Sequence, residues 1–254
     1  MQMTQLITKL SRTDARLIGR DRFLIFMFIF IVYIAGALRF LLPWADNYLA
    51  EAAILPNEFI AERLADFYPM IVAYMAIFTG ALIIGMVVGF VLLEEKDQNT
   101  LKAMLVSPLP LQQYIVYRVG LPARLAFVVI LAMILGINQA LLPLWQLGLI
   151  SAAGALTAPI AALFFAVFAE NKVAGFAYGK FVGLAGWVIA GSWFVPEPLQ
   201  WLFGIFPPYW VSKAYWLALE GRSIWWLALI IGVVLQLALI NWLIRRFSKV
   251  AYSI

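Results

Sequence analysis

Six long apolar segments constrain this sequence more than any other feature. Each has about 20 residues or more with very few charged side chains. Inside a bilayer the backbone must satisfy its own hydrogen bonds, so such segments cross it as α-helices. A transmembrane barrel would instead show alternating strands of about ten residues, which are absent from the sequence. We predict an all-α integral membrane protein whose six transmembrane helices cover residues 23–42, 68–93, 123–142, 147–168, 173–195 and 223–243.

The composition excludes several classes of function. Cysteine and histidine are both absent, which removes thiol nucleophiles, disulfides, histidine proton relays and most zinc sites. The predicted spans contain no pair of carboxylates. The chain therefore lacks the side chains that an intramembrane active site or a proton-coupled transport site would need. The net charge is +5, but the basic residues flank apolar segments. We therefore expect a lipid bilayer and no nucleic acid as partner.

The basic residues also predict the topology. With a cytoplasmic N-terminus, 18 Lys and Arg residues divide so that all but Arg39, Arg63, Lys213 and Arg222 lie inside. Such an excess is typical of the cytoplasmic side of membrane proteins. We predict a multi-pass protein of the plasma (inner) membrane with both termini cytoplasmic, which six spans satisfy.

The N-terminal segment, residues 1–22, places basic side chains three and four positions apart on one helical face, with leucines on another. This pattern is typical of an amphipathic helix that lies at the membrane interface. The alternative is an ordinary basic flank before the first span.

The cytoplasmic connection after the second span carries the main functional signal. A charged cluster ends the span, Asn99 or Thr100 can cap a helix of about two turns, and Ser107-Pro108 stops it. A short amphipathic helix of this kind could dock into a groove of another protein, although an ordinary capped loop resting on lipid remains an alternative. The residues predicted to form this contact are Glu94, Glu95, Lys96, Asp97, Thr100, Leu101, Met104, Leu105 and Pro108.

The string Glu-Lys-Asp-x-x-Thr-Leu-x-x-Met-Leu-Val-Ser-Pro-Leu at 95–109 resembles the cytoplasmic loop of permease subunits of type-2 ABC exporters, similar to multidrug and fluoroquinolone-type export permeases. The turn at 171–175 is also similar, whereas Asn99 departs from the glycine common in the family. The resemblance implies that 94–109 is a coupling helix contacting a separate nucleotide-binding subunit. It also implies short re-entrant outer helices within 196–222 and pairing with a second permease copy or homologue.

The chain has no ATPase machinery of its own. A phosphate-binding loop needs Gly, four residues, then Gly-Lys-Ser/Thr, and Gly179-Lys180 fails because Ala174 and Phe181 occupy required positions. We therefore expect one transmembrane permease domain over 1–254, with no catalytic, cofactor or metal residues, and with ATP and Mg²⁺ held by the partner ATPase. Such an exporter would carry amphipathic drugs or lipid-like compounds. The alternative function is a non-transporting multi-pass protein, such as an assembly or immunity factor.

Two further sets of residues have predicted roles. Gly175, Gly179 and Gly183 recur every four residues in the fifth span, a spacing that permits close helix packing within a subunit or across a dimer. Polar side chains in the spans are candidates for a translocation path, with interhelical hydrogen bonding as the favoured alternative. These polar residues are Asn138, Gln139 and Gln236.

Overall fold

The computed structural model describes residues 3–52, 64–97 and 111–253. Within these ranges the chain forms helices joined by turns, and no strand occurs. Six helical segments are long and apolar enough to cross a membrane, so the all-α membrane fold is confirmed. They are Arg22–Leu49, Leu64–Lys96, Gln113–Ile137, Leu144–Phe168, Lys172–Trp193 and Trp225–Lys249.

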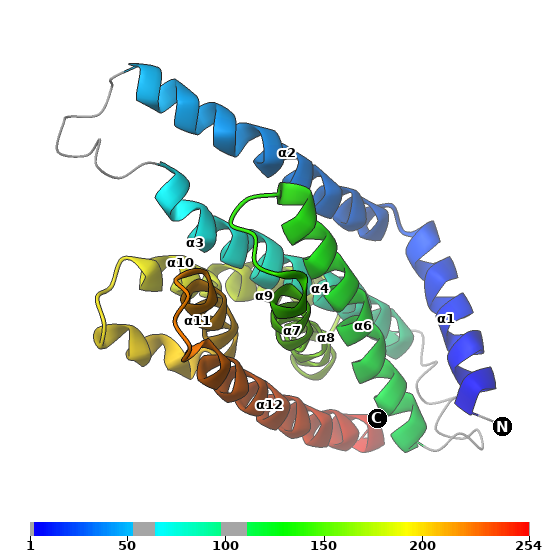
Figure 1. Ribbon diagram of the computed structural model, residues 1–254. Helices are drawn as coiled ribbons and strands as arrows, with labels where there is room; N and C mark the ends of the chain where they lie inside the picture. Colours follow the sequence, from blue (N-terminus) through cyan, green and yellow to red (C-terminus); the bar gives the residue numbers. More distant parts are fainter. Residues whose placement is uncertain (1–2, 53–63, 98–110, 254) are drawn as a thin grey trace.

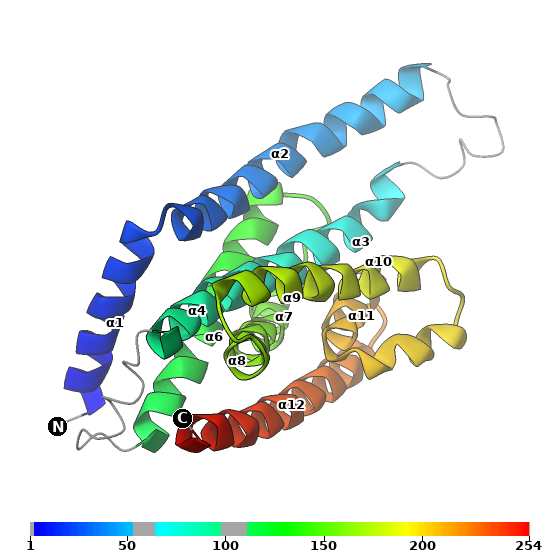
Figure 2. The same cartoon turned by 180° about the vertical axis from the view of Figure 1, so that it is seen from behind.

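The first two helices meet at a sharp change of direction (Figures 1 and 2). Helix α1, Met3–Arg20, ends just before Asp21, and α2, Arg22–Ala52, begins just after it. The Asp21 carboxylate accepts hydrogen bonds from the backbone N–H groups of Phe23 and Leu24, at 2.9 and 3.4 Å. Asp21 is thus the N-cap of α2. The predicted N-terminal helix is present, and its position at the membrane surface stays a prediction.

The second span lies in the middle of the bundle and is mostly buried. After a short 3₁₀ helix, η1, it continues through α3, η2 and α4. The element η2 is a π-helix, in which the Thr79 hydroxyl donates a hydrogen bond to the Tyr74 carbonyl at 2.9 Å. The bounds are Leu64–Phe67 for η1, Tyr68–Val72 for α3, Ala73–Thr79 for η2 and Gly80–Asp97 for α4.

The third span begins earlier and ends earlier than predicted. Helix α6, Leu111–Ile137, starts twelve positions before residue 123 and stops before Asn138. The prediction assigned residues 94–122 to one long polar connection between the spans. In the structure the Arg118 side chain is paired inside the protein and Pro122 is accommodated within the helix. The helix ends where Asn138 adopts a left-handed φ of 57°.

The fourth span consists of two helices, α7 (Leu144–Ala155) and α8 (Thr157–Phe168), which meet at Leu156. Helix α8 packs closely along α4, where glycines remove the side chains that would separate the backbones. A Cβ atom at Gly85 would lie 2.5 Å from the Ala158 carbonyl oxygen. This contact brings the second and fourth spans together.

The last third of the chain forms the fifth span, an intervening region of short helices and the sixth span (Figure 1). Helix α11 is almost entirely buried, because it packs along α12 and against α7 and η2. The short helices predicted within 196–222 are present as η3 and α11, and their re-entry into the membrane stays a prediction. The bounds are Lys172–Ala185 for α9, Trp187–Trp193 for α10, Leu199–Ile205 for η3, Pro207–Leu219 for α11 and Trp225–Ser253 for α12.

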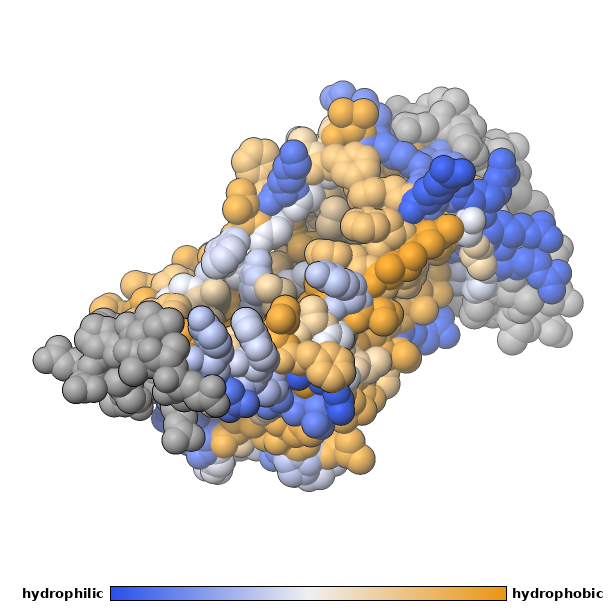
Figure 3. All heavy atoms as spheres, turned by 90° about the horizontal axis from the view of Figure 1, so that it is seen from above, coloured by the Kyte–Doolittle hydropathy of each residue, from blue (hydrophilic) through white to orange (hydrophobic). Residues whose placement is uncertain are grey.

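The surface has the character expected of a protein in a bilayer. In the view of Figure 3, hydrophobic residues cover the middle of the visible face, and hydrophilic residues gather at the upper right, with a second group toward the lower left. Many large apolar side chains of α2, α9 and α12 are exposed, among them Val32, Phe181 and Val234. These are surfaces for lipid or for another subunit.

Candidate functional site

The predicted coupling segment begins at the end of α4. Glu94, Glu95, Lys96 and Asp97 form the last helical turn of α4, and the next described residue is Leu111, where α6 begins. The remaining predicted contact residues lie outside the described part of the chain. They are Thr100, Leu101, Met104, Leu105 and Pro108.

A buried ionic cluster joins three helices at the base of this segment. Arg118 of α6 is 1% exposed. Its Nη1 atom donates to the Asp14 carboxylate of α1 at 2.8 Å, and its Nη2 atom pairs with the Glu95 carboxylate of α4. Tyr114 donates to Glu95 at 2.7 Å, and Tyr117 donates to Asp14 at 2.8 Å. The cluster therefore ties α1 and the end of α4 to the start of α6.

The ion pairs and ring contacts of Arg118 hold α1, α4 and α6 together. The Arg118 guanidinium also lies over both tyrosine rings, 5.2 Å from the centroid of Tyr114 and 5.4 Å from that of Tyr117. Two carboxylates, those of Asp14 and Glu95, share one guanidinium. Removing one partner from a buried ion pair leaves a buried charge without compensation, which is strongly destabilising. The three helices are thus held together as a unit.

A second ionic contact connects the same end of α4 to the fifth span. The Lys172 ammonium at the start of α9 lies 3.2 Å from Asp21 and 3.0 Å from Glu94. Partial burial raises the pKa of Asp21, but the hydrogen bonds from Lys172 and from the Phe23 and Leu24 amides outweigh it and lower the pKa overall. Asp21 therefore stays ionised as the cap of α2 and as a partner of Lys172.

Lys96 completes the anchorage of α4. Its ammonium donates a hydrogen bond to the carbonyl of Ala169, just after α8, at 3.2 Å. A cation at this position also interacts favourably with the C-terminal end of the α8 dipole. The side chains of Glu94, Glu95 and Lys96 are thus engaged with other helices of the same chain and form the base of the segment.

The sequence did not indicate Asp14, Tyr114, Tyr117 or Arg118 as functional residues. One local signal was available, because Tyr114 lies three residues before Tyr117 and four before Arg118, and such pairs are neighbours on a helix. Their acidic partners could not be read from spacing, since Asp14 lies 104 positions from Arg118.

Two of the three fifth-span glycines pack inside the subunit. A Cβ atom at Gly175 would lie 2.7 Å from the Phe90 ring, and one at Gly179 would lie 2.6 Å from the Met86 methyl group. Both contacts are with α4. Gly183 has nothing within 4 Å of a Cβ position, so its face is open to lipid or to another chain.

The three polar residues predicted to line a translocation path lie in different surroundings. Asn138 and Gln139 lie in the turn after α6 and not inside the third span, because the helix ends at Ile137. Gln236 of α12 is fully buried. Its amide nitrogen donates to the Ala153 carbonyl at 3.1 Å, and its amide oxygen accepts from the Thr157 hydroxyl at 2.9 Å. Gln236 therefore bridges the break between α7 and α8, as the interhelical alternative predicts.

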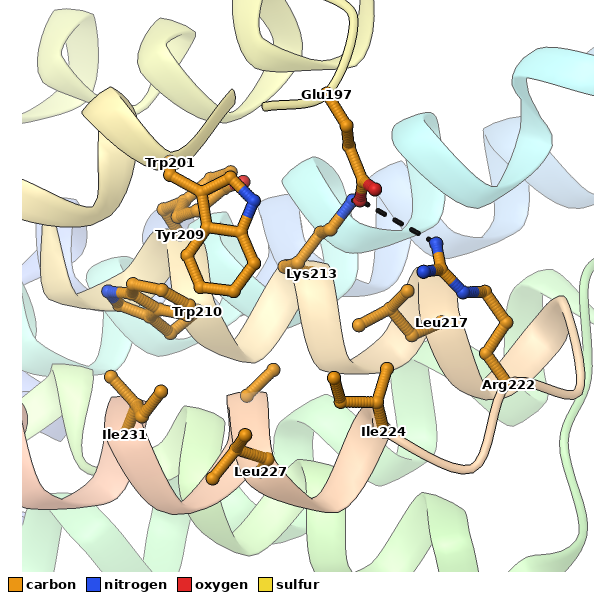
Figure 4. Close-up of a pocket in the computed structure, with 11 residues that line it drawn as sticks. Glu197, Trp201, Tyr209, Trp210, Lys213, Leu217, Arg222, Ile224, Leu227 and Ile231 are labelled. Carbon is orange, nitrogen blue, oxygen red and sulfur yellow. Dashed lines mark hydrogen bonds and ion pairs between the residues drawn. The ribbon is translucent and has the colours of Figure 1, made fainter. Parts of the chain in front are cut away.

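A pocket lies between α11, α12 and the segment that precedes α11 (Figure 4). At one end the Lys213 ammonium donates to the Glu197 carboxylate at 2.5 Å and to the Gln200 side chain at 2.7 Å, and Arg222 lies 3.6 Å from Glu197. At the other end are aromatic side chains of Trp201, Tyr209 and Trp210. Burial raises the pKa of Tyr209 to about 12, which keeps its hydroxyl neutral. The pocket combines ring faces with charges of both signs.

The ion pairs of this pocket predict a dependence of stability on pH. The hydrogen bond from Lys213, and then the charges of Lys213 and Arg222, lower the pKa of Glu197. A lowered pKa contributes stability above the ordinary carboxyl range, near pH 4.3, and that stability is lost as the pH falls through the folded-state value. We expect the unfolding temperature to fall more in wild type than in Glu197→Gln between about pH 6 and pH 3. Thermal unfolding in detergent measures this difference, and parallel pH profiles would contradict the prediction.

Comparison with known proteins places this architecture in a family. Residues 14–244 match the family described as "Fluoroquinolones export permease protein Rv2686c-like". Two relatives from Mycobacterium tuberculosis are named fluoroquinolones export permease proteins, MT2760 of strain CDC 1551 / Oshkosh and Rv2686c of strain ATCC 25618 / H37Rv. Each is 29% identical over 252 residues, which cover 93% of this chain and 92% of the relative. The chain therefore belongs to the Rv2686c-like family of export permeases and is a multi-pass membrane protein.

Proposed function

We propose that this permease is the membrane subunit of an ATP-driven ABC exporter. Two permease chains, identical or homologous, form the translocation path, and separate nucleotide-binding subunits bind ATP and Mg²⁺. The segment 94–109 is the coupling helix that contacts them. The chain itself performs no catalysis, in keeping with the absence of a phosphate-binding loop in its sequence.

The observation that carries this proposal is the anchorage of both flanks of the coupling segment. The end of α4 binds α1 and α6 through Arg118, and it binds α9 through Lys172. A push on the segment would therefore move four helices together instead of bending one loop. Packed elements that move as units between two arrangements are the usual basis of such transitions.

The relatives' names support a substrate class. We propose that the exported compounds are amphipathic, aromatic drugs of the fluoroquinolone type, because the exposed walls of the spans are largely apolar. The pocket of Figure 4 adds ring faces beside a carboxylate and two cations, a surface suited to such compounds on the side that carries α11.

The docking role of the segment can be tested by co-expression with an ABC-type nucleotide-binding subunit from the same organism and co-purification in detergent. We expect Leu101→Asp/Met104→Asp to lose the ATPase, because two carboxylates would be buried against a partner surface. Glu95 is left unchanged, since its side chain holds the fold together. The control, Arg246→Asp/Lys249→Asp, adds acidic charge at the end of α12 and should retain the ATPase.

Each outcome of this experiment has a clear meaning. Retention of the ATPase by the loop variant would place docking elsewhere on the permease. Failure of the wild type to bind any ATPase would refute the ABC exporter. For complexes in proteoliposomes, fluoroquinolone-stimulated ATP hydrolysis then tests the substrate class, and absence of stimulation would contradict it.

A further inference from the structure

An apolar groove of about 490 Å³ lies on the outside of the bundle between α2 and α6. It is lined from α2 by Phe28, Ile31 and Gly36, and from α6 by Val129, Ala132 and Gly136. The flanking side chain of Val32 is 73% exposed, so the groove opens to the surroundings of the protein and not into its core. For a helix that spans a membrane, those surroundings are lipid or another subunit.

The residues that line the groove on α2 extend over a distance close to the thickness of one leaflet of the hydrocarbon core. From Phe28 to Gly36 the helical rise is about 12 Å, and one half of the hydrocarbon core is about 15 Å thick. A Cβ atom at Gly36 would have nothing within 4 Å, so the space beside this residue holds no protein atoms. Gly136 faces Ala35 at 3.7 Å from its Cβ position, an ordinary contact. The small residues thus leave space that the protein itself does not fill.

One end of the groove carries a positive charge. Arg39 lies about one helical turn beyond Gly36, is exposed, and donates from Nη1 to the Gly136 carbonyl at 3.1 Å. Among the residues described, no carboxylate lies within 4.0 Å of its guanidinium. An arginine within a spanning helix normally pairs with an anion or reaches the phosphate layer. The charge of Arg39 therefore calls for an anionic group at the end of the groove.

We propose that this groove binds one phospholipid, with an acyl chain between α2 and α6 and the phosphate at Arg39. A phospholipid supplies both parts of the complementary surface, an apolar chain and an anion beside it. A second permease copy fits less well, because a two-fold contact through this face would present the same residues from both chains and bring two Arg39 side chains together. The bound lipid would pack against the exposed face of α2.

The test uses full-length protein purified in mild detergent and analysed by native mass spectrometry during titration with phosphatidylglycerol. We expect Gly36→Phe to weaken binding about tenfold or more, because the ring occupies the path of several methylene groups. We expect Arg39→Gln to weaken it about fivefold, the effect of one basic side chain near anionic lipid. Gly183→Phe, at a glycine that is equally open on α9, and Arg245→Gln are controls that should bind as wild type does.

Diacylglycerol, which has no phosphate, separates the two parts of the proposal. It should bind more weakly than phosphatidylglycerol to wild type and be unaffected by Arg39→Gln. Equal binding of both lipids would overturn the role of Arg39, and unchanged binding by Gly36→Phe would overturn the groove. If wild type binds no lipid and Gly36→Phe converts dimers to monomers, the groove is a protein interface and the proposal is wrong. None of these outcomes depends on ATPase docking.

Discussion

Replacement of Arg118 by methionine is expected to lower the free energy of unfolding by about 3–5 kcal/mol. The change leaves the carboxylates of Asp14 and Glu95 buried without their cation. It also removes the guanidinium from between two tyrosine rings. The matched control is Arg124→Met on the same helix, where the exposed side chain donates to the Gly120 carbonyl at 3.1 Å. The control should change stability by about 0.5 kcal/mol or less.

Denaturant unfolding of both variants in detergent measures the difference. If the cluster also connects the coupling segment to the bundle, Arg118→Met should weaken the contact of α1 with α4 and α6. Hydrogen exchange would then rise at residues 11–20 more than in the Arg124→Met control. Equal stability of the two variants would show that the cluster is not a structural connection.

Replacement of Gly85 by leucine is expected to cost about 3 kcal/mol of stability, the upper part of the range for overpacking. Its Cβ atom would lie 2.5 Å from the Ala158 carbonyl oxygen and 2.6 Å from the Ala161 Cβ atom. Since one of these contacts is with backbone, α4 and α8 must move apart. Gly148→Leu is the control, because a Cβ at Gly148 has nothing within 4 Å.

Thermal unfolding, followed by the loss of monodisperse protein on size exclusion, measures this effect. The Gly85 variant should aggregate at a clearly lower temperature than wild type, whereas the Gly148 variant should follow wild type. A Gly85→Leu protein as stable as its control would mean that the α4–α8 contact adapts without cost.

The fold was largely predictable because each span carries its own signal. The segments at 23–42 and 223–243 contain enough consecutive apolar residues to be assigned without knowledge of their neighbours. The predicted start of the third span was inaccurate because a charge there is paired in three dimensions. The third span was placed too late because Arg118 was taken as a loop residue, whereas the helix buries it against Asp14 and Glu95.

The candidate site was predicted only in part. Spacing and capping residues predicted a short helix after the second span, and this helix lies outside the described residues. The charged residues before it were correctly placed at the end of a helix. Their partners were not predictable, since Lys172 lies 78 positions from Glu94 and 151 positions from Asp21. Close helix packing of Gly175 and Gly179 was predicted from spacing, while its location against α4 required the structure.

The sequence by itself determined that this chain forms a bundle of six membrane helices, because the transfer of each apolar segment into lipid depends on the composition of that segment alone. Only the tertiary structure decided which polar groups meet. Gln236 spans the break between α7 and α8, and Arg118 joins two distant carboxylates, because helix packing brings these groups within hydrogen-bonding distance. Such contacts depend on the relative placement of whole helices, which no local pattern of residues specifies.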